Sequence, residues 1–70
     1  MEAQEIEKRF SYHPVKNEEQ QAKYELVRRT FKKLAEAMNE VLPESREKSV
    51  ALTELETAQF WSNASIARNE

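Results

Sequence analysis

The chain has 70 residues, a net charge of −2, and neither Cys nor Gly. The missing Cys excludes disulfides and thiolate metal sites, and a single His excludes a multi-histidine metal site within one chain. The missing Gly excludes the phosphate-binding loops of P-loop and dinucleotide-binding proteins. Because a domain of this size buries only about 60% of its unfolded surface, its core is marginal and association is the remaining way to stabilise it. We predict one helical domain over residues 1–70, without a metal or other cofactor.

The acidic residues favour an all-α fold, and the net charge argues against a nucleic-acid partner. All 13 acidic residues are Glu, which suits helix interiors better than Asp. A slightly acidic total is unlike that of a general nucleic-acid binder. No apolar run approaches the ~18 residues of a membrane span, and the acidic start of the chain lacks a signal-peptide core. We therefore expect a cytoplasmic protein that contacts neither a membrane nor long nucleic acid.

A short first helix is predicted over residues 2–10. Its apolar residues share one face, because they are spaced three and four apart: Ala3, Ile6 and Phe10. Pro14 disfavours helical geometry at His13, so residues 11–17 are expected to form a loop. We expect Phe10 to be a core residue.

The second helix is predicted over residues 18–42 and has the clearest periodicity in the chain. Asn17 is the expected N-cap, with Gln20 three residues on, as in a capping box. The apolar stripe consists of Tyr24, Val27, Phe31, Leu34, Ala35, Met38, Val41 and Leu42. Pro43 either closes this helix or stands in the first turn of the next one.

The third helix is predicted over residues 44–67, antiparallel to the second, and its apolar residues cover nearly all its faces. One stripe holds Ala51, Leu52, Leu55, Ala58, Ser62 and Ile66. Val50 and Trp61 lie off this stripe on one side, and others lie off it on the opposite side: Phe60, Ala64 and Ala67. A helix that is apolar nearly all round is a buried helix. Two partner helices cannot cover all these faces, so we predict a homo-oligomer.

Catalytic groups are sparse in this sequence. His13 has Ser11 and Tyr12 beside it, but neighbours in sequence do not form a catalytic triad by themselves. Nearly all the Glu residues fall on faces predicted to be exposed, where no displaced pKa is expected. We therefore expect the protein not to be an enzyme.

Ligand-binding groups gather at the end of the first helix. Arg9 can bind phosphate through two hydrogen bonds, and Tyr12 beside His13 offers a surface on which a base can stack. The alternative is structural, with Tyr12 packed against the second helix. For Tyr12 and His13 the residues alone leave both interpretations open.

Two further segments carry candidate binding residues. Residues 28–33 hold four positive charges, and Arg28 flanks the apolar stripe, where it could reach a ligand between helices or subunits. The alternative for this cluster is a solvated face. In residues 61–69, Asn63 offers hydrogen bonds and Arg68 a cation, although a helix C-terminus favours a cation in any case. Trp61 is more typical of an interface or core anchor.

Three strings resemble a known family: EIEKRFSYH at residues 5–13, PESREKSVALT at 43–53 and WSNASIAR at 61–68. Together they resemble the small phage anti-CBASS sponges, which act on the cyclic oligonucleotide signals of a bacterial immune system. The resemblance spans nearly the whole chain and is weakest over residues 14–42. It implies a helical homohexamer that binds cyclic di- and trinucleotides, such as cyclic GMP-AMP, between protomers and does not cleave them.

The resemblance also implies roles for particular residues. Tyr12 carries over as a cyclic-dinucleotide contact, and the neighbouring candidates are Arg9, His13 and, by its place on the second helix, Arg28. Arg68 carries over as a trinucleotide contact, with Asn63 as the second candidate there. Two other functions stay open: a helical protein-interaction module docking onto a host protein, and a nucleic-acid binder that uses residues 28–33. The sponge is the function that we predict, in the cytoplasm of an infected bacterium.

Overall fold

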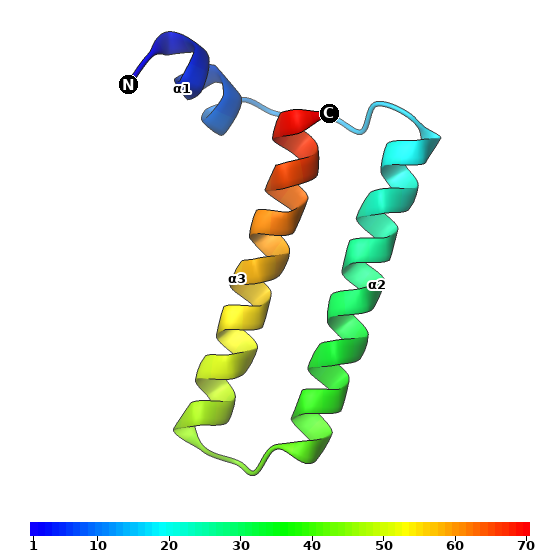
Figure 1. The fold of residues 1–70 in the computed structure, drawn as a ribbon, viewed down its shortest axis with the longest axis vertical. Coiled ribbons are helices and arrows are strands. Elements are labelled where there is room, and N and C mark those ends of the chain that lie inside the picture. The colour runs from blue at the N-terminus through cyan, green and yellow to red at the C-terminus, as the bar shows by residue number, and fades with distance from the viewer.

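The computed structural model describes residues 1–70 and contains three α-helices and no strands. They are α1 (Ala3–Phe10), α2 (Glu18–Val41) and α3 (Arg46–Asn69). The two long helices run antiparallel as a hairpin, and α1 lies at its open end beside the C-terminal end of α3 (Figure 1). This confirms the predicted all-α fold with one short and two longer antiparallel helices. Each predicted long helix differs from the observed one by one or two residues at its ends.

The start of α2 is built by hydrogen bonds that its sequence predicts. The backbone of Asn17 is extended, and its Oδ1 accepts a hydrogen bond from the Gln20 backbone N–H at 2.8 Å. The Gln20 side chain is only 3% exposed, and its Oε1 accepts from the Lys16 backbone N–H at 2.8 Å. A capping box would instead engage the N–H of Asn17. The N-cap is therefore confirmed, while the returning bond falls one residue earlier.

The turn between the long helices settles the place of Pro43. Leu42 has an extended backbone and ends α2, so Pro43 lies in the connection and closes the second helix. Ser45 then caps α3, with its Oγ accepting from the Lys48 backbone N–H at 3.1 Å. The predicted start at residue 44 is two residues early because the capping role of Ser45 was missed.

Lys48 stabilises this turn from a buried position. It is one of the two buried residues of the chain, at 6% exposure. Its Nζ donates to the backbone carbonyl of Asn39 at 2.8 Å and also pairs with the Glu44 carboxylate. The last carbonyls of a helix lack partners within the helix, so Lys48 satisfies one of them from the next helix.

We expect Lys48→Met to destabilise the hairpin by about 1–3 kcal/mol, because it leaves the Asn39 carbonyl without its donor while keeping a long apolar stem. Urea unfolding followed by circular dichroism, at one fixed protein concentration, measures this difference. Lys33→Met on the exposed side of α2 is the matched control. Equal free energies of unfolding for the two variants would show that the Lys48 contacts contribute nothing.

The single chain buries no hydrophobic side chain, because it is one layer of helices thick. Its extents are 45 × 32 × 13 Å, and the shortest is close to the ~10–12 Å diameter of one helix. Phe10 is 78% exposed, so the expectation that it is a core residue is wrong for the single chain. The reason is that α1 does not pack its apolar face against the hairpin.

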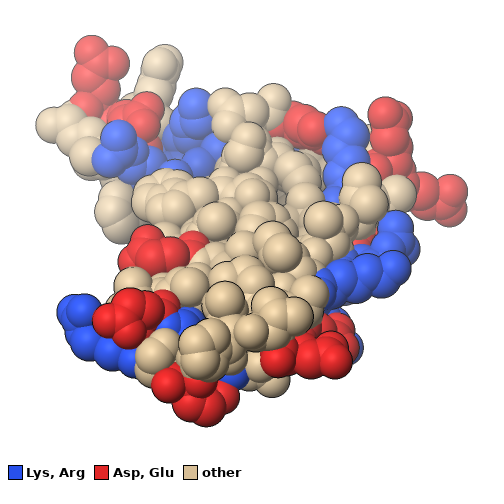
Figure 2. Space-filling model, turned by 60° about the horizontal axis from the view of Figure 1, so that its bottom comes forward, with Lys and Arg blue, Asp and Glu red and all other residues tan.

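The predicted apolar stripes are only partly covered within the hairpin. Most of their residues are half-buried, but Leu34 and Val41 on α2 are exposed, as is Ala58 on α3. Figure 2 shows, from the hairpin-turn side, a broad area without Lys, Arg or Glu, with charged side chains around its edge. No helix is both long enough and apolar enough to cross a membrane.

Candidate ligand-binding site

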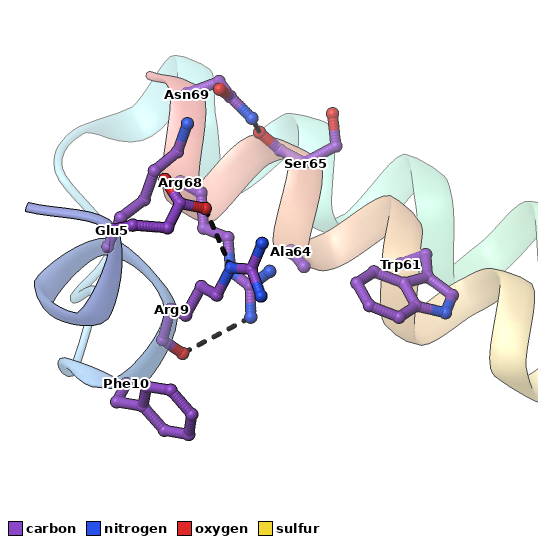
Figure 3. A pocket seen from close by; sticks show the side chains of 9 residues that line it. Glu5, Arg9, Phe10, Trp61, Ala64, Ser65, Arg68 and Asn69 are labelled. Atoms are coloured by element: carbon purple, nitrogen blue, oxygen red, sulfur yellow. Dashed lines mark hydrogen bonds and ion pairs between the residues drawn. The ribbon is translucent and has the colours of Figure 1, made fainter. Parts of the chain in front are cut away.

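A groove of about 480 Å³ lies where α1 meets the C-terminal end of α3. Side chains from both helices line it, as Figure 3 shows. They belong to Glu5, Lys8, Arg9, Phe10, Trp61, Ala64, Ser65, Arg68 and Asn69. Three of these residues are cations and one is a carboxylate, so the groove carries an excess of positive charge. Arg and Lys are the residues that bind phosphate most readily, so the groove suits an anionic ligand.

Arg68 joins the two helices across this groove. Its Nη2 donates to the backbone carbonyl of Arg9 at 3.3 Å, and its guanidinium carbon lies 5.9 Å from the centre of the Trp61 ring. The second distance is within the ~6 Å range of cation–π contacts. Arg68 is half-buried, so its position is held by neighbours on both helices.

Arg9 is engaged by a carboxylate on its own helix. Its Nε donates to Glu5 Oε1 at 2.8 Å, and both side chains are exposed. The hydrogen bond from Arg9 holds the pKa of the Glu5 carboxyl below its ordinary value. The pair is therefore intact above the ordinary Glu range and is lost as the pH falls through the lowered value. Exposed ion pairs contribute little to stability, so a ligand phosphate can replace Glu5 as the partner of Arg9.

A second groove, of about 370 Å³, lies between the loop after α1 and the hairpin. It brings together His13, Tyr24, Arg28 and Asn63, with apolar and amide neighbours. His13 Nε2 lies 2.8 Å from the carbonyl of Lys8, and because a carbonyl only accepts, this nitrogen is the donor. The bond turns the chain at the end of α1 and leaves Nδ1 free.

No three His, Cys, Asp or Glu side chains are close enough to hold a metal ion.

The sequence profile of the Acb2/Tad1 hairpin domain matches residues 1–67. The chain belongs to this family. It is the anti-CBASS sponge family, so the resemblance seen in the three strings is confirmed. No curated protein and no solved structure matches the chain. The matched range includes α1 and α2 entirely and ends one residue before Arg68.

In this Acb2/Tad1 chain, residues predicted to bind different ligands line the same groove. Arg9, a predicted dinucleotide contact, lines the same groove as Arg68. Asn63, a predicted trinucleotide contact, lines the other groove with His13 and Arg28. Asn63 and Arg68 are five residues apart on α3, so their side chains point about 140° apart and reach different grooves. The assignment of each residue to a ligand stays a prediction.

Tyr12 stands apart from both of the grooves described above. Its side chain is 86% exposed and lines neither of them, so it does not pack against α2. The structural alternative for Tyr12 is therefore wrong for the single chain. An exposed ring beside the end of α1 is free to meet a ligand or a second chain.

Two groove residues were not singled out in the sequence. Lys8 supplies one of the three cations, and Glu5 supplies the carboxylate that holds Arg9. The spacing of Glu5 and Arg9, four apart on a helix, is the signal that could have found the pair. Lys8 has no comparable signal, since its place depends on how α1 lies against α3.

Proposed function

We propose that this protein is a phage immune-evasion protein that sequesters cyclic di- and trinucleotides without cleaving them. In this role it keeps the effector of a bacterial CBASS system inactive, in the cytoplasm of the infected cell. Membership of the Acb2/Tad1 family, over residues 1–67, is the observation that carries the proposal. Cations in both grooves support it, since cyclic oligonucleotides present several phosphates at short range.

Sequestration of a nucleotide needs no acid, base or nucleophile, whereas its cleavage does. The pKa values of Glu5 and Lys23 are displaced, and both residues lie on the surface. Arg9 lowers the pKa of Glu5, and a hydrogen bond to Glu70 at 2.7 Å raises that of Lys23. Each shift comes from an ordinary surface ion pair rather than from a buried, strongly perturbed group of the kind that marks many active sites.

The proposed binding unit is a homohexamer rather than the single chain. Small-molecule sites usually enclose most of the ligand surface. Both grooves are shallow in the single chain, whose thickness is only 13 Å. Contact between copies would close the grooves and cover exposed apolar side chains such as Leu34 and Val41 on α2. The same step therefore stabilises the fold and completes the sites.

The proposal is tested by mixing the purified protein with cyclic GMP-AMP, measuring binding by calorimetry, and then denaturing the protein by heat. We expect saturable binding and release of intact nucleotide, as judged by chromatography. Cleaved product would identify an enzyme. Absence of binding to any cyclic di- or trinucleotide at micromolar concentration would refute the sponge function.

Tyr12→Ala is expected to weaken cyclic-dinucleotide binding by about 5- to 150-fold, because one base-stacking contact contributes about 1–3 kcal/mol. Calorimetric titration with cyclic GMP-AMP measures the change, and sedimentation should show an unchanged assembly. Tyr12→Phe is the matched control, since it keeps the ring and should keep most of the affinity. If Tyr12→Ala dissolves the assembly, Tyr12 is an interface residue instead.

The exposed apolar side chains also favour a second candidate, a helical module that docks onto a host protein. Val50, Phe60 and Trp61 are 44–65% exposed on α3 in the single chain. The two candidates differ in the free state of the protein. Sedimentation that gives a closed hexamer supports the sponge, and a stable monomer or dimer supports the docking module.

A further inference from the structure

Trp61 is the only tryptophan in the chain and lies in the groove between α1 and α3. Its side chain is 65% exposed, which is unusual for a large apolar ring unless it meets a partner. We propose that Trp61 is a base-stacking residue that makes this groove favour purine-containing cyclic trinucleotides. This inference rests on the proposed function and adds a specificity-determining residue to it.

The geometry places a stacking surface next to a phosphate-binding group. Trp61 and Arg68 are seven residues apart on α3, so they lie on the same side of the helix two turns apart. The Arg68 guanidinium carbon is 5.9 Å from the centre of the indole ring. A nucleotide joins an anionic phosphate to a flat base through one sugar. A phosphate on Arg68 would therefore place the adjoining base within reach of Trp61.

The surrounding groups fit a nucleotide rather than a bare anion. Lys8 and Arg9 add positive charge on the α1 side of the groove. Phe10 lies across the groove, on the α1 side, as Figure 3 shows. Trp61 is the better placed of the two rings, because α3 is held by its packing along α2 whereas α1 has few contacts with the hairpin. The groove thus combines cations with an exposed ring on a fixed helix.

Purine selectivity follows from the size of the ring systems. Stacking on an aromatic side chain tolerates every base, and modest preferences among bases come from stacking strength and backbone flexibility. The two-ring indole overlaps a two-ring purine more fully than a one-ring pyrimidine. A cyclic trinucleotide of adenosines should therefore gain more from Trp61 than one of uridines.

The lone tryptophan reports on its own environment in the assembled protein. We expect cyclic triadenylate to quench Trp61 fluorescence in a saturable titration whose Kd matches that from calorimetry, and cyclic triuridylate to quench less. Unchanged emission at saturating cyclic triadenylate would overturn the stacking role. Binding without quenching would leave the sponge function standing and remove only this inference.

Substitution of Trp61 provides a second test of its stacking role. Trp61→Leu keeps an apolar side chain but removes the ring, and we expect it to weaken cyclic triadenylate binding about 10-fold or more and cyclic triuridylate binding less. Phe60→Leu is the matched control, because Phe60 is the adjacent exposed ring, at 61%, and does not line this groove. Its affinities should stay within about twofold of those of the unmodified protein.

The remaining outcomes of these experiments also test the stacking role of Trp61. Equal affinity of Trp61→Leu and the unmodified protein for cyclic triadenylate would overturn the inference. If Trp61→Leu dissolves the assembly, the fluorescence titration of the unmodified protein decides, since an interface residue without ligand contact is not quenched selectively by adenosine. If no cyclic di- or trinucleotide binds, the proposed function fails and the stacking role fails with it.

Discussion

Arg68→Ala is expected to weaken cyclic-trinucleotide binding by about 10- to 150-fold. A hydrogen bond to a charged group contributes about 1.5–3 kcal/mol, and each 1.4 kcal/mol changes Kd tenfold. Arg68 is half-buried, and it lines a groove that holds two further cations, Lys8 and Arg9. Calorimetric titration with cyclic triadenylate measures the loss.

The controls for Arg68 separate charge, geometry and structure. Arg68→Lys keeps the charge but not the forked donor geometry, so we expect intermediate affinity. Arg29→Ala on the exposed face of α2 removes the same charge elsewhere and should leave binding unchanged. Because Arg68 also donates to the Arg9 carbonyl, the helix content and assembly of Arg68→Ala must be checked. Loss of the oligomer in this variant would make Arg68 a structural residue.

Leu34→Glu is expected to break the assembly into smaller species and to weaken binding of both classes of cyclic nucleotide. Leu34 and Val41 are seven residues apart on one face of α2, and they are 48% and 73% exposed in the single chain. A carboxylate at such a site stays hydrated in the free chain, whereas burying it without a partner costs several kcal/mol. Dissociation of the oligomer should therefore become about 100-fold easier or more.

Analytical ultracentrifugation over a range of protein concentrations measures this shift. Lys33→Glu is the control, because it introduces a carboxylate at the adjacent exposed position. An intact hexamer in Leu34→Glu would show that this face of α2 does not lie between copies. Dissociation of the Leu34→Glu oligomer with unchanged affinity for cyclic nucleotides would contradict the proposed inter-protomer sites.

The helices could be predicted closely because their signals are local. Asn17 caps α2 through an atom three residues away, and Pro43 closes it by steric clash with its own neighbours. Lys48 could not be predicted in the same way, because its main acceptor is a carbonyl nine residues back on another helix. Burial of a lysine is decided by the turn between two helices, which periodicity within one helix does not describe.

The residues of the candidate site were predictable in part and their grouping was not, since Tyr12 lines neither groove and Lys8 and Glu5 were not expected there. Arg9, Arg68, His13, Arg28 and Asn63 all line one of two grooves. Pairing Arg9 with Arg68 needs the fold of α1 over the end of α3, which rests on few contacts and one long-range hydrogen bond. Phe10 was misjudged for the same reason, since an apolar stripe predicts burial only when another element covers it.

By itself the sequence determined the helical fold, the positions of the helix ends to within one or two residues, the family and the kinds of side chain available for ligands. These properties depend on neighbouring residues and on recurring strings. Only the tertiary structure decided which cations share a groove, which rings stay exposed and that one chain buries no apolar side chain. Those properties depend on contacts between helices distant in sequence, whose energies no local pattern encodes.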